Sequence, residues 1–182
     1  MLRVFTRGVK TFTPSYLKLQ VGQIQSCKKH DASDKLYVSQ VDIGHESQLQ
    51  ICSGLVPFLP IEEMYNRRVV VVTNMKTRKL RGEASMGMIL AAEKEINDKL
   101  KVEPITPPKS SILGERLYFG GADSFEPPKL KDKSWEYIQP RLTTNSDRQV
   151  VFVDDQLGEL VLRGTDETDS ATAETLVNAK IL

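Results

Sequence analysis

The sequence predicts a mainly β protein, in which a five-stranded barrel with one short helix is followed by a second, mostly β subdomain. Between residues 17 and 92, short stretches alternate apolar and polar residues, a period that is typical of half-buried strands. A Pro-rich stretch at 103–108 separates this part from the remainder. Hydrophobic residues make up 40% and charged residues 27% of the 182-residue chain, the composition of an ordinary globular protein.

Five stretches of the first part are predicted to be strands. In the first of them the alternation changes phase at Gly22, which suggests a bulge or a sharp bend there. The fourth is almost continuously apolar and is expected to be buried. The predicted strands are 17–25, 36–43, 48–54, 68–73 and 86–92.

A short helix is predicted between the third and fourth strands, at 59–66. Pro60 stands near its first position, and Glu62 and Glu63 lie in its first turn, where acids are favourable. This order of elements is that of the OB-fold, a barrel that binds ligands with strands 2 and 3 and with the loops that follow strands 1 and 4. In this chain those loops are 26–35 and 74–85.

Cationic side chains are concentrated in these two loops, although the net charge is only +1. The stretch 66–82 alone carries six cations and no acid. Arginine and lysine bind phosphate oxygens, and neutralising several phosphates gives strong, salt-dependent affinity. We therefore predict that nucleic acid binds at this rim of the barrel. The predicted contacts are Lys28, Lys29, Ser53, Asn74, Lys76, Arg78, Lys79, Arg81, Ser85 and Met86.

The uncharged members of this set have alternative roles. Asn74 and Ser85 could form hydrogen bonds with a sugar or a base. Ser53, at the end of the third strand, could contact ligand or satisfy a turn. Met86 is predicted to share a strand face with Met88, and filling the barrel core is the favoured role of both, ahead of a soft surface for a base.

No catalytic site, metal site or cofactor is predicted. His30 and Asp34 share a loop, but nothing near them in the sequence supplies a nucleophile or a metal. Cys27 and Cys52 follow no metal-binding spacing and lie in alternating stretches, so buried, reduced thiols are expected. Tyr37, on the second strand, could stack on a base, but its position in the alternation leaves its direction open.

The second subdomain, 104–182, is predicted to be mostly β. Its helix should begin with Ser134 as N-cap. Lys129, Lys131 and Lys133 form a weaker basic patch just before that helix. The predicted elements are strands at 116–119, 150–155 and 160–164 and a helix at 134–142.

The N-terminal stretch 1–14 is expected to be a disordered leader or a targeting peptide. It contains Arg3, Arg7 and Lys10 and no acid, which is the composition of a mitochondrial presequence. We expect a cytoplasmic protein, with a mitochondrial location as the alternative. No apolar run reaches the length of a transmembrane helix, so no membrane association is predicted.

Several stretches resemble the EMAP-II-like tRNA-binding domain family, and the likeness covers about residues 17–160. The most specific is the pattern Asn-x-Lys-x-x-x-x-Arg-Gly-x-x-Ser-x-Gly-Met, which is met by Asn74, Lys76, Arg81, Gly82, Ser85, Gly87 and Met88. The other similar stretches are KHDASDKLYVSQVDIG (29–44), CSGLVPFLPIEEMYNRRVVVV (52–72), EPITPPKSSILGERLYF (103–119) and SWEYIQPRLTTN (134–145).

The resemblance implies an OB-fold domain at 15–103 that binds tRNA by shape at its outer corner. It also implies that 104–182 packs on the barrel as a second subunit does in related dimers, so that the chain is a monomeric pseudo-dimer. The resemblance further implies an accessory domain that raises tRNA capture by an aminoacyl-tRNA synthetase and is not itself a catalyst. The chain departs from the family pattern at Asp31 and Ser33, and at Asp132, which interrupts a lysine triplet. These departures predict a different setting of the first loop and a smaller contribution of the second subdomain to tRNA affinity.

Two other functions stay open. The chain could be a structural, protein-interaction subunit of a synthetase complex with little RNA binding of its own, using apolar surface around Leu130, Trp135 and Tyr137. It could instead bind single-stranded nucleic acid on the OB face. A steep loss of affinity with salt would distinguish phosphate binding from an apolar protein interface.

Overall fold

The long strand β1 (Leu19–Lys29) organises the structure, a computed structural model that describes residues 12–182. Its first half pairs with β4 (Arg68–Val72) and with β10 (Arg116–Phe119), and its second half pairs with β2 (Tyr37–Asp42). Of the predicted leader, residues 1–11 lie outside the described residues.

The remaining elements follow the predicted order with several additions. They are η1 (Pro14–Tyr16), β3 (Leu49–Ser53), η2 (Ile61–Glu63), β5 (Arg78–Leu80), β6 (Glu83–Ser85), β7 (Met88–Ile89), β8 (Ala91–Ile96), β9 (Lys99–Pro104), α1 (Asp132–Ile138), η3 (Gln139–Arg141), β11 (Leu142–Thr144), β12 (Val150–Asp154), β13 (Gly158–Arg163) and β14 (Lys180–Ile181).

The barrel predicted for the first part is confirmed in outline. β3 pairs with β2, and β7 pairs with β4, all antiparallel. The two ends of this curved sheet meet where the Met86 N–H donates to the Gln50 carbonyl, 2.8 Å away. Gly22 lies where β1 is squeezed between its neighbours, since a Cβ there would come within 2.8 Å of Val41 Cγ1 and 3.0 Å of Val71 Cγ2. The register shift itself falls later than predicted, between residues 24 and 26.

Three predicted boundaries in the barrel were wrong. β1 runs on to Lys29, so Lys28 and Lys29 lie on a strand and not in a loop. The helix expected at 59–66 is a single 3-10 turn. The loop expected at 74–85 contains the hairpin of β5 and β6, because two residues with positive φ, Arg81 and Gly82, allow a tight turn.

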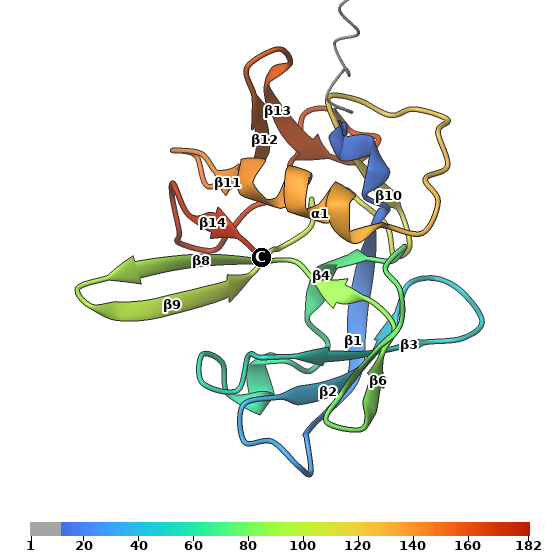
Figure 1. Cartoon of the computed structure of the whole chain (residues 1–182), viewed down its shortest axis with the longest axis vertical. Helices are drawn as coiled ribbons and strands as arrows, with labels where there is room; N and C mark the ends of the chain where they lie inside the picture. The colour runs from blue at the N-terminus through green and yellow to red at the C-terminus, as the bar shows by residue number, and fades with distance from the viewer. Residues whose placement is uncertain (1–11) are drawn as a thin grey trace, which may run out of the picture.

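The fifth strand expected at 86–92 is divided between β7 and β8. β8 then forms a hairpin with β9 that the sequence analysis missed, turned at Asn97 and Asp98, which both have positive φ. Figure 1 shows this hairpin extending away from the barrel. Its first strand also pairs with the C-terminal β14.

The second subdomain packs directly on the barrel. One apolar core lies inside the barrel and consists of residues between 24 and 102. The other is shared, because it combines Leu19 and Val70 of the barrel with Ile138, Phe152 and Leu162 of the second part. Together with the β1–β10 pairing, this shared core joins the two predicted parts. Figure 1 shows the second subdomain lying directly on the barrel.

The hairpin predicted at 150–164 is confirmed as β12 and β13. The helix begins earlier than predicted, at Asp132, with Lys131 as its N-cap residue. Ser134 therefore lies within the first turn, where it is buried, and is not the N-cap. Leu142 belongs to the following strand. In the part of the chain that the structure describes, no helix is long and apolar enough to cross a membrane.

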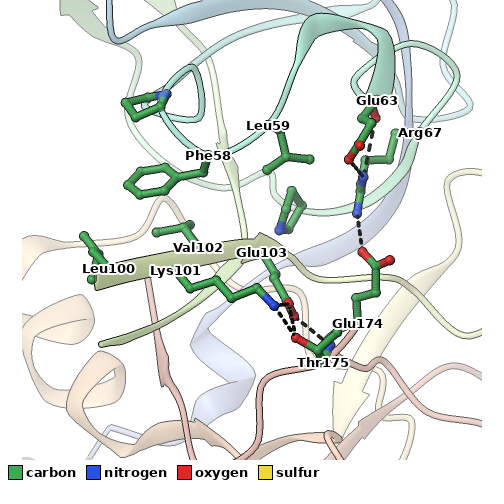
Figure 2. A pocket seen from close by; sticks show the side chains of 12 residues that line it. Phe58, Leu59, Glu63, Arg67, Leu100, Lys101, Val102, Glu103, Glu174 and Thr175 are labelled. Atoms are coloured by element: carbon green, nitrogen blue, oxygen red, sulfur yellow. Dashed lines mark hydrogen bonds and ion pairs between the residues drawn. The ribbon is translucent and has the colours of Figure 1, made fainter. Parts of the chain in front are cut away.

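Glu103 on β9 binds residues 175–176, in the segment before β14 (Figure 2). Its carboxylate accepts hydrogen bonds from the backbone N–H of Thr175 at 2.9 Å and of Leu176 at 3.2 Å, and from the Thr175 hydroxyl. Lys101 Nζ lies 3.0 Å away. Burial alone would raise the pKa of Glu103, but these donors outweigh it and hold that pKa below its usual range.

We predict that Glu103→Gln lowers the free energy of unfolding by about 1–3 kcal/mol at neutral pH, because a charged acceptor of several hydrogen bonds is lost. A carboxyl whose pKa is lowered by folding stabilises fully above its unfolded pKa, about 4.3, and loses that contribution as pH falls through the folded value. The difference between wild type and variant should therefore shrink below about pH 4.

Urea unfolding at neutral and acidic pH measures this difference. Glu95→Gln, a substitution at an exposed acid on the neighbouring strand, is the matched control and should change little at either pH. A Glu103→Gln effect that stays the same on acidification would contradict the assigned role of the carboxylate.

Candidate nucleic-acid interface

The β5–β6 hairpin carries the densest group of cations. It forms a separate two-stranded sheet in which Arg78 pairs with Ser85 and Leu80 with Glu83. Side chains alternate along a strand, so Arg78 and Lys79 point to opposite faces. Lys76, Arg78, Lys79 and Arg81 are all exposed.

Gln50 on β3 holds the hairpin against the barrel. Its side-chain amide donates to the Glu83 carboxylate at 3.0 Å and to the Ala84 carbonyl at 2.9 Å. The Ser85 hydroxyl accepts from the Cys52 N–H at 3.0 Å. Hydrogen bonds to β3 therefore fix the position of the hairpin that carries these cations.

His30 ties the hairpin to the first rim loop. Its Nδ1 accepts the Ala32 N–H at 2.9 Å, and its Nε2 lies 3.0 Å from the Leu80 carbonyl. Because Nδ1 is an acceptor, Nε2 must carry the hydrogen and donate to Leu80. An open hollow of about 690 Å³ is lined by residues 29–35 and by Arg81 of the hairpin. Its lining includes three cations, Lys29, Lys35 and Arg81, and two acids, Asp31 and Asp34.

The basic patch of the second subdomain lies beside this hairpin. The Leu130 N–H donates to the Asn74 carbonyl at 2.7 Å, and Lys129 Nζ donates to the Met75 carbonyl at 3.2 Å. Further along, Arg78 Nη2 lies 2.9 Å from an Asp132 oxygen. Segments 74–82 and 128–133 thus run side by side. We call their exposed cations the cationic ridge: Lys76, Arg78, Lys79, Arg81, Lys129, Lys131 and Lys133.

Lys28 and Lys29 lie at the far end of β1, beside the first rim loop. Both are exposed, and Lys28 Nζ is 3.8 Å from an Asp31 oxygen. Lys35 was not among the predicted contacts, although it belongs to the loop that the sequence marked as part of the rim. Its place in the hollow makes it an additional candidate.

Most of the uncharged predicted contacts point inward. Asn74 and Ser85 are each only 6% exposed, and internal hydrogen bonds engage both side chains. Tyr37 is 1% exposed, and its hydroxyl donates to the Leu59 carbonyl, so it fills the core and cannot stack on a base. These three residues position the surface and do not form it.

Two uncharged contacts differ from this pattern. The Ser53 hydroxyl oxygen is buried and has no hydrogen-bond partner among the described residues. Met86 is 39% exposed, whereas Met88 is half-buried against the shared core. The favoured prediction that both methionines fill the core was therefore wrong for Met86, because Met86 precedes β7 and does not belong to it.

The described residues contain no cluster of histidine, cysteine or acidic side chains that could hold a metal ion. Cys27 and Cys52 are buried and unpaired with each other, and burial raises the pKa of both thiols, so they stay protonated.

The residues suggested for a protein interface are only partly accessible. Leu130 is 5% exposed, and Tyr137 stacks under the Arg141 guanidinium at 3.8 Å. The apolar surface suggested there for a protein partner is therefore largely covered.

A groove of about 320 Å³ lies between η2 and β9 (Figure 2). Arg67 lies 4.0 Å from a Glu63 oxygen and 3.5 Å from a Glu174 oxygen, and Lys101 pairs with Glu103. Because acids neutralise both of these cations, the groove does not match the charge of a phosphate chain. The cationic ridge does.

Comparisons with known proteins identify the family of the chain. Residues 19–116 match the family model described as "Putative tRNA binding domain". The tRNA-aminoacylation cofactor arc1 of Schizosaccharomyces pombe is 36% identical over 176 residues, which cover 94% of this chain and 39% of that protein. The probable methionine–tRNA ligase of Oryza sativa subsp. japonica is 40% identical over 144 residues, 78% of this chain and 18% of the ligase.

Among solved structures, the C-terminal domain of Plasmodium vivax p43 superposes with a TM-score of 0.73 at 23% identity, covering 94% of this chain and 100% of that one. This likeness shows the fold. The chain spans less than half the length of both curated relatives. The family match covers more than half of the chain, and the chain therefore belongs to this tRNA-binding domain family.

Proposed function

We propose that the chain is a tRNA-binding accessory module that captures tRNA by shape and phosphate contacts, as a cofactor of an aminoacyl-tRNA synthetase. The cationic ridge carries this proposal, because its seven exposed cations come from two segments that are distant in the sequence and lie side by side in the fold. Duplex RNA is recognised mainly through its backbone and shape, which such a surface suits.

The binding residues fall into two groups in this proposal. Arg78 and Arg81 present planar guanidinium forks that can hold two phosphate oxygens, and the lysines act as point charges. Lys28, Lys29 and Lys35 extend the contact area across the hollow beside Arg81. Asn74, Ser85 and His30 position these cations without contacting RNA.

The proposal includes no enzymatic step and no cofactor. The relative named as a cofactor supports an accessory role, and the relative named as a ligase is matched over only 18% of its length. We further propose that the chain acts as a monomer, because the shared core already places a second subdomain against the barrel. We expect its partners to be tRNA and a synthetase, and its location to be the cytoplasm.

The cations of the hairpin should supply most of the affinity for tRNA. Changing Lys76, Arg78, Lys79 and Arg81 together to glutamine should remove most of the affinity for tRNA. The slope of log affinity against log salt should become shallower by about 3, since each lost phosphate contact removes about 0.7–0.9. Titration of fluorescent tRNA over a salt series measures both quantities.

A matched control changes four exposed cations outside the ridge to glutamine: Lys99, Lys109, Arg148 and Lys180. It removes the same charge but should keep most of the affinity and the slope. Equal losses in both variants would mean that tRNA senses only overall charge. If the hairpin variant keeps the wild-type affinity and slope, the hairpin is not part of the binding site.

His30 should position the hairpin for RNA binding without contacting phosphate itself. His30→Ala removes the bond to the Leu80 carbonyl and should free the hairpin from the rim loop. We expect tRNA affinity to fall by about 3–10-fold with an unchanged salt slope, because no phosphate contact is lost. A slope that becomes shallower by about 0.7–0.9, the value of one phosphate contact, would instead mean that His30 itself binds phosphate.

His30→Gln is the conservative companion, since its amide can still donate to the carbonyl. It should restore part of the affinity that His30→Ala loses. Hydrogen exchange at the hairpin amides, measured without RNA, should be faster in the alanine variant than in wild type.

A further inference from the structure

A single acid lies within the cationic ridge. Segments 74–82 and 128–133 contain seven cations and one acid, Asp132. This carboxylate is paired with a member of the ridge, since its Oδ1 lies 2.9 Å from Arg78 Nη2. An RNA phosphate that binds Arg78 must therefore compete with the Asp132 carboxylate, which already occupies one of its N–H donors.

The pair is open to solvent. The Arg78 side chain is 60% exposed and the Asp132 side chain 72% exposed. Exposed ion pairs are weak and are screened by salt, so a phosphate from solution can displace this carboxylate. Phosphate and carboxylate oxygens also use the same guanidinium donors, and only one of them can occupy a given N–H group.

We propose that Asp132 competes with RNA phosphate for Arg78 and so keeps the tRNA affinity of the ridge below the value that its cations alone would give. This inference rests on the proposed function. It assigns Asp132 the role of setting affinity, and Arg78 the role of exchanging an internal carboxylate for a phosphate when RNA binds.

Asp132 also has a structural position that the test must separate from this role. It is the first residue of α1, where an acid favours the helix. Asp132→Asn keeps the size and an oxygen acceptor at that position but removes the charge. Thermal unfolding of this variant shows whether the helix has been weakened.

The experiment measures tRNA binding over a salt series for wild type, Asp132→Asn, Arg78→Gln and the double variant. We expect Asp132→Asn to bind about 3–10-fold tighter at low salt, with a similar slope of log affinity against log salt, because Arg78 binds one phosphate in both complexes. In the Arg78→Gln background, Asp132→Asn should raise the tRNA affinity only slightly, because the two residues act as a pair. Glu136→Gln, an exposed acid on the same helix, is the matched control and should gain little.

The outcomes are distinct. If wild type binds tRNA and Asp132→Asn binds it no more tightly, this inference is overturned and the proposed function stands. A gain that is equally large in the Arg78→Gln background also overturns it, because the acid would then act through its field alone. If neither wild type nor Asp132→Asn binds tRNA, the proposed function and this inference fall together.

Discussion

The buried side chain of Asn74 is the constraint on which the cationic ridge depends. Its amide donates to the Tyr16 and Pro128 carbonyls, both at 2.8 Å, and its own backbone carbonyl accepts the Leu130 N–H. One polar side chain, 6% exposed, thus joins the segment before β1, the end of β4 and the approach to α1. It therefore holds the approach to α1 against the end of β4, next to the Leu130–Asn74 backbone bond and the Lys129–Met75 contact that join the same two segments.

The local features of the fold could be predicted from the sequence, because apolar alternation records which face of each strand is buried. The approximate position of the two rim segments followed from the order of strands, although Lys28 and Lys29 lie on β1 and residues 78–85 form a hairpin. Through-space pairing could not be predicted in this way. Arg67 and Arg68 belong to the same cationic run as the hairpin, yet Arg67 pairs with Glu174 and Arg68 donates to the Ser111 carbonyl. His30 looked like a loop residue, and only the fold shows that it bonds the hairpin.

The ridge can function in a chain whose net charge is only +1 because charge acts locally in salt water. The Debye length is about 8 Å at physiological ionic strength, so a phosphate senses the cations beside it and little of the acidic surface elsewhere. The hairpin is also separate from the main sheet and held at its base by Gln50. Its cations therefore need no rearrangement of the core to meet RNA.

The central claim is that one tRNA-binding surface is assembled from both halves of the chain, and amine labelling with and without tRNA tests it most directly. The labelled lysines are quantified by mass spectrometry after digestion. We predict that tRNA protects Lys76 and Lys79 together with Lys131 and Lys133, while Lys180 stays reactive. Protection confined to the hairpin lysines, or equal protection of Lys180, would contradict a shared surface.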